Sequence, residues 1–267
     1  MEKSKIGFIG CGNIASAIIL GSLKSGYIKS DSLYVYDTDS AKSDAFILQG
    51  AAVCGSAEEL VKCCDYVFLT VKPQIYDTVL RQIRSVSKDV CFVAVAAGIT
   101  IAHIKEVLGY DASIVRVMPN TPLMCGQGSS ALVKCSPVTD EQYAYIKGIF
   151  SCCGVAVDVK ESEINTVTAI SGSAPAYAMR FAKVLIEFAI ENGMSEANAK
   201  TLVLHTMLGS AFMAKTSDND IDSLIRNVTS PNGTTEAGLK SMDSTGFDTS
   251  LRSSLEATVK RAEELTR

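Results

Sequence analysis

The amino-acid sequence predicts an α/β protein built on a parallel sheet, followed by an all-α second part. Two observations predict this fold class. Over residues 1–159, short apolar runs alternate with longer amphipathic stretches, a pattern typical of a parallel sheet with helices on its faces. After residue 160, apolar side chains recur at helical spacing. We therefore expect two domains, over residues 1–159 and residues 160–267.

The runs expected to form strands are rich in β-branched and aromatic residues, which suits strands that are buried on both faces. They are residues 5–10, 33–37, 66–71, 91–97, 113–118, 129–135 and 154–159. Helices are expected between them, for example over residues 13–26 and 75–86. The apolar side chains of the helical part, such as Tyr177, Phe181 and Phe188, could pack within the domain or form a subunit interface.

Composition excludes several classes of protein. The net charge of −4 gives no indication of nucleic-acid binding. The most membrane-like run, residues 184–190, is too short to span a bilayer and contains Glu187. The nine cysteines form no C-x-x-C pattern, so no metal site is expected. Because the first residues enter a strand-like run without a signal peptide, we expect a cytoplasmic protein with reduced thiols.

A glycine-rich turn follows the first expected strand. Gly10, Gly12 and Ala15 form a G-x-G-x-x-A pattern that opens a helix. Gly10 permits a tight turn, Gly12 lets the backbone approach a pyrophosphate, and Ala15 lets the helix pack close to the strand. The helix N-terminus then offers N–H groups to the anion. We expect a Rossmann-type dinucleotide site here; the alternative is a plain tight turn.

Asp37 and Ala15 give opposite indications about the cofactor. Asp37 ends the second expected strand, where an acid binds the adenosine ribose hydroxyls and would repel a 2′-phosphate, which favours NADH. An alanine at the third glycine position is instead common among proteins that bind NADPH. The sequence therefore leaves NADPH or NADH open, and Asp37 could also be only a turn or capping residue.

Further motifs are unusual for ordinary structure. They are "VKPQ" at 71–74, "AAGIT" at 96–100, "RVMPNTP" at 116–122, "GQG" at 126–128, "ISGSAPAY" at 170–177 and "VTSPNGTT" at 228–235. In their order and spacing the chain resembles pyrroline-5-carboxylate reductase over nearly its whole length. The resemblance implies a Rossmann-type N-terminal domain and an all-α C-terminal dimerisation domain. It also implies reduction of Δ1-pyrroline-5-carboxylate to L-proline with NADPH or NADH, by a homodimer or a ring of dimers up to a decamer.

The resemblance also assigns site residues. The cofactor is expected at Gly10, Gly12, Asn13, Ile14, Asp37, Val71, Lys72, Pro73, Ala97, Gly98, Met118, Pro119 and Asn120. The substrate is expected at Ser230, Asn232, Gly233, Thr234, Thr235 and Asp218. Thr235 matches the family's threonine that hydrogen-bonds the ring nitrogen, which makes it the expected catalytic residue. Asp218 could instead be a helix cap.

The residues of the 230–235 loop support this assignment on their own. Three hydroxyls, with Asn232 and Gly233 to permit a turn, can converge on a small carboxylate. The alternative is a helix cap. Imine reduction needs neither a nucleophile nor a metal, because the cofactor supplies the chemistry, and this fits a chain with only two histidines.

Several positions depart from the family pattern. Ala174 and Asn232 replace glycines, Lys183 stands where an acid is usual, and His205 stands where glutamine is usual. Two other functions fit the sequence less well. A 3-hydroxyacid dehydrogenase is disfavoured because no lysine follows Gly172 by one helical turn. A non-catalytic dinucleotide sensor is disfavoured because it would need no carboxylate loop.

Overall fold

The computed structural model describes residues 4–87 and 89–267 and divides into two compact units. The first unit comprises residues 4–173, apart from the undescribed position, together with residues 258–267. The second unit comprises residues 174–257. The last ten residues of the sequence thus belong to the first unit. The two units divide after residue 173, whereas periodicity predicts a boundary after residue 159.

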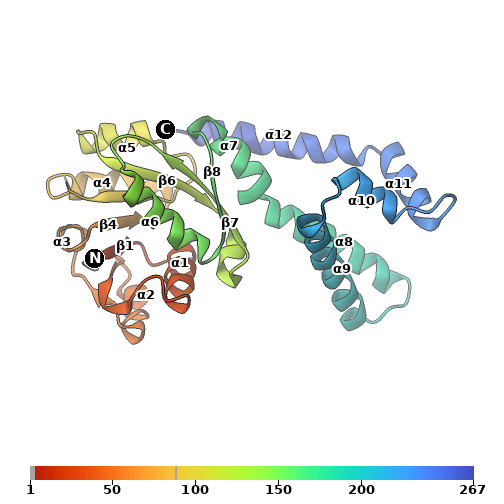
Figure 1. The fold of residues 1–267 in the computed structure, drawn as a ribbon, viewed down its shortest axis with the longest axis horizontal. Coiled ribbons are helices and arrows are strands. Elements are labelled where there is room, and N and C mark those ends of the chain that lie inside the picture. The colour runs from red at the N-terminus through yellow and green to blue at the C-terminus, as the bar shows by residue number, and fades with distance from the viewer. Residues whose placement is uncertain (1–3, 88) are drawn as a thin grey trace. The chain divides into compact units, whose positions relative to one another are not determined.

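The first unit is built on a mostly parallel sheet, as the sequence predicts (Figure 1). Its described strands are β1 (Ile6–Ile9), β2 (Leu33–Tyr36), β3 (Ala52–Val53), β4 (Tyr66–Leu69), β5 (Cys91–Ala94), β6 (Ser113–Pro119), β7 (Gly128–Lys134) and β8 (Gly154–Asp158). They lie in the order β3-β2-β1-β4-β5-β6-β7-β8. Only the β6–β7 pair in this sheet is antiparallel.

The strand order places a topological switch between β1 and β4. The chain moves outward from β1 through β2 to β3, then returns to the other side of β1 and moves outward again. The carboxyl ends of β1, β2, β4 and β5 lie at one edge because these strands are parallel. In open α/β sheets this edge, at the switch point, is where ligands bind.

Helices cover both faces of the sheet. They are α1 (Asn13–Lys24), α2 (Ser40–Asp44), α3 (Ala57–Cys63), α4 (Tyr76–Ile83), α5 (Ile101–Leu108), α6 (Asp140–Ser151) and α7 (Ile164–Val167). Ile6 and Phe8 share one apolar cluster with residues of α1 and α6, while Ile9 belongs to the cluster that α3, α4 and α5 complete. Alternate side chains of β1 therefore enter opposite cores, which explains its continuous apolar sequence.

The second unit is helical, as predicted, but it has almost no core of its own. It contains α8 (Ala174–Glu191), α9 (Glu196–Thr216), α10 (Ile221–Asn227), α11 (Thr234–Ser244) and the first part of α12 (Phe247–Leu265). Among its described residues only Ala182 and Ala199 are buried. Leu208, Phe188 and Phe212 are each exposed by 64% or more. Such a surface is typical of helices that a partner covers.

Candidate cofactor and substrate site

The phosphate loop has the geometry that its glycines predict. Gly10 has a φ of +95°, and its N–H donates to the Tyr36 carbonyl at 2.8 Å. A Cβ built on Gly12 meets nothing within 4 Å, so the space above that residue is open. Gly12 also caps α1 without a side chain, which leaves the first N–H groups of the helix without an intrahelical partner. This open, donor-rich turn fits a pyrophosphate.

Asp37 joins the end of β2 to the phosphate loop. Its Oδ2 accepts the Cys11 N–H at 2.7 Å, and its Oδ1 accepts the Asp39 N–H at 2.9 Å. A carboxylate has about four acceptor positions, so two remain for the hydroxyls of a ribose. The turn role and the ribose role that the sequence left as alternatives are therefore compatible.

Cys11 lies within the same loop and is buried. Burial, together with the charge of Asp37, raises the pKa of its thiol to about 12. The side chain is thus neutral at physiological pH, and no thiolate opposes the binding of an anion here.

Thr70 was not singled out from the sequence, although it is the polar residue that ends an apolar strand. Its Oγ1 donates to the Gly10 carbonyl at 2.6 Å and lies 3.1 Å from the Ile9 carbonyl. The end of β4 is thereby fastened to the phosphate loop. Next to it, Val71 and Pro73 are half-buried and Lys72 is exposed, which leaves the lysine free to reach toward an anionic ligand.

The loop after β5 carries Ala97 and Gly98. Ala97 is exposed, whereas Gly98 is buried and has a φ of +76°. Only a glycine adopts this backbone conformation without strain. Ala97 is therefore the residue of this pair that faces solvent at the carboxyl edge of the sheet.

Asn120 is buried at the end of β6, after Met118 and Pro119, and its amide is bonded within the chain. Its Oδ1 accepts the Ser129 N–H, and its Nδ2 donates to the Ser129 hydroxyl, both at 2.9 Å. Nδ2 also lies 3.3 Å from the Ser171 carbonyl, and the hydroxyls of Ser129 and Ser171 are 2.9 Å apart. Ser171 belongs to a single π-helical turn, Thr168–Gly172, a feature often found at functional sites.

Arg116 begins the motif at 116–122 and lies in β6. It is 3% exposed, and its Nη1 donates to Glu161 Oε1 at 2.9 Å. The same carboxylate oxygen accepts the Ile101 N–H at the start of α5. Arg116 therefore supports the structure at the level of the loop after β5.

In the second unit, the 230–235 loop leads into α11. Asn232 has a φ of +56°, the left-handed conformation that asparagine tolerates. The Gly233 N–H donates to the Ser230 carbonyl at 3.0 Å, and a Cβ on Gly233 would lie 2.3 Å from the Ser230 hydroxyl. Gly233 caps α11 without a side chain, so the N–H groups of Thr234 and Thr235 remain available to an anion.

Glu236, in the first turn of α11, is bonded to the same loop. Its Oε2 accepts the Asn232 N–H at 2.6 Å, and its Oε1 is paired with Lys240 at 2.9 Å. These hydrogen bonds lower the pKa of Glu236, and the bond from Lys240 has the largest effect. A carboxylate of the chain itself thus already binds a backbone donor of the loop.

The other residues questioned in the sequence are exposed. Asp218 lies in the turn between α9 and α10, His205 is on α9, and Lys183 on α8 pairs with Glu187 at 3.4 Å.

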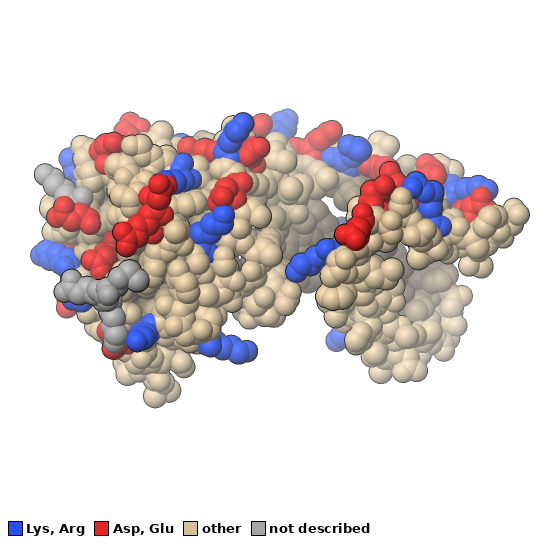
Figure 2. Space-filling model, in the orientation of Figure 1, with Lys and Arg blue, Asp and Glu red and all other residues tan. Residues whose placement is uncertain are grey.

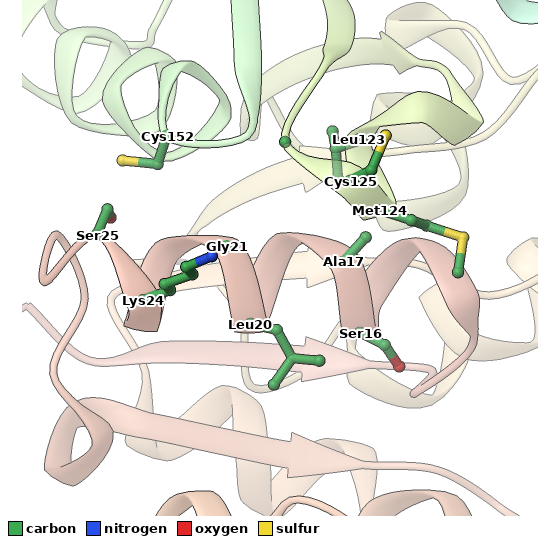
Figure 3. Close-up of a pocket in the computed structure, with 11 residues that line it drawn as sticks. Ser16, Ala17, Leu20, Gly21, Lys24, Ser25, Leu123, Met124, Cys125 and Cys152 are labelled. Carbon is green, nitrogen blue, oxygen red and sulfur yellow. The ribbon is translucent and has the colours of Figure 1, made fainter. Parts of the chain in front are cut away.

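A separate cavity of about 530 Å³ lies on the outer face of α1. Figure 3 shows Ala17, Leu20 and Gly21 of this helix along it, with Leu123 and Met124 opposite. None of the residues expected to bind cofactor or substrate lines it. The candidate binding residues therefore lie in the loops described above for each unit, and not at this cavity.

The fold and the phosphate loop define a dinucleotide-binding oxidoreductase with a helical second unit. A family model described as pyrroline-5-carboxylate reductase dimerisation matches residues 161–265. A second, described as NADP oxidoreductase coenzyme F420-dependent, matches residues 5–98. Both matches follow the division into a nucleotide-binding part and a helical part.

Named relatives match the entire chain. The pyrroline-5-carboxylate reductase of Escherichia coli (strain K12) is 35% identical over 272 residues and 100% of both chains. That of Pisum sativum is 33% identical over 99% of this chain and 97% of its own.

Solved structures agree with these relatives. The Plasmodium falciparum pyrroline carboxylate reductase with NADP bound has a TM-score of 0.91 and 32% identity, and the Coxiella burnetii pyrroline-5-carboxylate reductase has a TM-score of 0.93 and 31% identity. Each match covers 100% of both chains. The chain belongs to the pyrroline-5-carboxylate reductase family, which confirms the resemblance seen in its motifs. It is an oxidoreductase that uses NAD(P)H.

The Asn120 network predicts a stability effect. Replacing Asn120 by alanine leaves the half-buried polar groups of Ser129 and Ser171 without this partner, so we expect the free energy of unfolding to fall by about 2 kcal/mol. Chemical denaturation measures this loss. Asn192→Ala is the control, because that exposed amide bonds only to the Phe188 carbonyl one turn earlier. Equal stability of the Asn120 variant and the unchanged protein would contradict the network.

Proposed function

We propose that this protein reduces Δ1-pyrroline-5-carboxylate to L-proline with NAD(P)H, the last step of proline biosynthesis, and that the residues described above carry the reaction. The observation that carries the proposal is the pairing, in one chain, of an open phosphate loop at Gly12 with an anion-binding loop at 230–235. Membership of the reductase family supports the same reaction.

The cofactor site that we propose follows the carboxyl edge of the sheet. Gly10, Gly12, Asn13 and Ile14 would hold the pyrophosphate at the start of α1, and Asp37 the adenosine ribose. The remaining residues proposed to contact the cofactor are Val71, Lys72, Pro73, Ala97, Gly98, Met118, Pro119 and Asn120. Because the amide of Asn120 is bonded to Ser129 and Ser171, we assign it the task of positioning its loop.

The substrate carboxylate would lie against the 230–235 loop. The hydroxyls of Ser230, Thr234 and Thr235 and the N–H groups that begin α11 can donate to it, each charge-assisted bond contributing about 1.5–3 kcal/mol. Asn232 and Gly233 give the backbone the turn that aims these donors. We include Asp218 as a residue near the substrate amine, on the strength of the family resemblance alone.

Reduction of the imine needs few reactive side chains. When bound, the reduced nicotinamide supplies the hydride that the imine carbon receives. A protonated imine nitrogen makes that carbon electrophilic, so no nucleophile or metal is needed. Thr235 would hydrogen-bond the ring nitrogen and orient the imine, and most of the acceleration would come from positioning.

The direct test is an absorbance assay. Adding pyrroline-5-carboxylate to the purified protein with NADH or NADPH should lower the reduced-nicotinamide absorbance and form proline in equal amount. Protein that binds the cofactor but oxidises none would overturn the proposed reaction and indicate a dinucleotide sensor. Oxidation of the cofactor only when a 3-oxoacid replaces pyrroline-5-carboxylate, with the 3-hydroxyacid formed, would indicate the dehydrogenase class instead.

Thr235→Ala tests the assigned catalytic residue. Losing the hydroxyl should lower kcat about 100-fold, within the range for a positioned proton-transfer group, and leave cofactor affinity unchanged. Thr235→Ser retains a hydroxyl and should recover most of the activity. A fully active alanine variant would refute the role of Thr235.

Asp37→Ser tests the cofactor preference. We propose that Asp37 makes NADH usable, so its loss should raise the KM for NADH about tenfold, as for a hydrogen bond to a charged group, and shift the preference toward NADPH. Asp39→Ser removes the same charge from a residue that pairs with Lys42 at 3.3 Å, and it should leave the preference unchanged. An unchanged NADH-to-NADPH ratio in the Asp37 variant would contradict this role.

The helical unit supports a homodimer, or a ring of dimers up to a decamer. Leu204, Leu208 and Phe212 recur at one-turn intervals on α9 and are exposed by 46%, 65% and 64%. Burying an aspartate in an apolar interface is costly, so Leu208→Asp should reduce the molar mass measured by light scattering to that of a smaller species. Ser85→Asp, which adds the same charge to the first unit, should not. An unchanged mass for Leu208→Asp would argue against an interface on this face of α9.

We further propose a cytoplasmic location and small-molecule rather than nucleic-acid partners. All nine cysteines are free thiols, as expected in a reducing compartment. On the face seen in Figure 2, basic side chains are scattered among acidic ones. Within the described residues, no helix combines the length and the apolar character needed to cross a membrane.

A further inference from the structure

We propose that residues 265–267, at the end of α12, position the nicotinamide end of the cofactor site by fastening the loop after β5. The proposal rests on the proposed function, because it takes Ala97 and Gly98 as cofactor contacts. It adds a positioning role for Thr100 and for the backbone of Arg267, which are not among the residues proposed above to contact cofactor or substrate.

Three hydrogen bonds join the two segments. The Arg267 N–H donates to the Gly98 carbonyl at 2.8 Å. The Arg267 carbonyl in turn accepts the Thr100 N–H at 3.2 Å and the Thr100 hydroxyl at 2.6 Å. The bonds lie on either side of Ile99, so the loop is held at two points by a single residue.

The approach of the segment is close enough to require a glycine in the loop. A Cβ on Gly98 would lie 2.5 Å from the Leu265 carbonyl oxygen, and the φ of +76° disfavours any other residue. The positive φ and the close contact thus have one explanation. The loop turns sharply at Gly98 so that its back can receive the 265–267 segment.

Thr100 links this contact to the helix that follows. Its hydroxyl accepts the His103 N–H at 3.1 Å as the N-cap of α5 and donates to the Arg267 carbonyl. Ile101, the first residue of α5, is held by Glu161 at 2.9 Å. The loop is therefore fixed by α5 on one side and by the 265–267 segment behind it, while Ala97 stays exposed.

This arrangement bears on hydride transfer because reacting groups must be placed closely. A loop whose backbone groups were solvated would sample many conformations, and ordering it would cost part of the cofactor's binding free energy. The adenosine end is proposed to lie at Asp37, on the β2 side of β1, so the nicotinamide end would reach the ends of β4 and β5 on the other side, where the loop at Gly98 lies. Loosening the 265–267 segment should thus affect the nicotinamide end alone.

The test compares binding of a whole dinucleotide with binding of ADP-ribose, which lacks the nicotinamide. Thr100→Val removes one hydrogen bond and should weaken NADH binding about fivefold, deletion of Arg267 removes all three and should weaken it more, and both should leave ADP-ribose binding unchanged. Fluorescence titration measures the first and calorimetry the second. Thr100→Ser keeps the hydroxyl and should bind both ligands as the unchanged protein does.

Thr139→Val is the matched control. Thr139 caps α6 through the Gln142 N–H at 3.1 Å, as Thr100 caps α5, but no bond joins it to the 265–267 segment. It should lower stability without changing NADH binding. The proposal is overturned if Thr100→Val and the deletion bind NADH normally, if they lose ADP-ribose equally, or if Thr139→Val weakens NADH binding as much. If the unchanged protein binds no reduced dinucleotide at all, the proposed function itself fails.

Discussion

The parallel register of β1, β2, β4 and β5 is the constraint on which the candidate cofactor site depends. It brings four strand ends to one edge, and two side-chain contacts and one backbone contact then tie the loops there together. Asp37 binds the N–H of Cys11, Thr70 binds the carbonyl of Gly10, and Arg267 fastens the loop at Gly98. None of these groups needs unusual reactivity. Their common effect is to give a flexible, glycine-containing edge a single shape before any ligand arrives, which lowers the entropy lost on binding.

The two units differ in how much apolar surface they bury. The first unit buries the large side chains of its sheet between two layers of helices. The second unit exposes most of its apolar side chains, because its long helices present more such surface than its own chain covers. If another copy of the chain covers these helices, as we propose, the 230–235 loop becomes rigid only in the assembly. Oligomerisation and substrate binding are then linked.

Local features of the fold could be predicted from the sequence, and distant partners could not. The apolar runs predicted seven of the eight described strands to within a few residues and missed the two-residue β3, and Gly10 and Asn232 have the positive φ that their positions indicated. By contrast, Asn120 meets Ser171 across 51 positions and Thr100 meets Arg267 across 167. The spacing of apolar residues indicates whether a segment is a helix or a strand. It does not indicate which other segment packs against it. For the same reason the return of residues 258–267 to the first unit was not foreseen.

The central claim is that one hydride passes from the nicotinamide to the imine carbon of pyrroline-5-carboxylate. The most direct measurement uses NADH and NADPH that carry deuterium at both C4 positions, with mass spectrometry of the product. This hydride transfer predicts proline with a single deuterium at its C5 carbon for each cofactor oxidised. Unlabelled proline, or oxidised cofactor without proline, would contradict it.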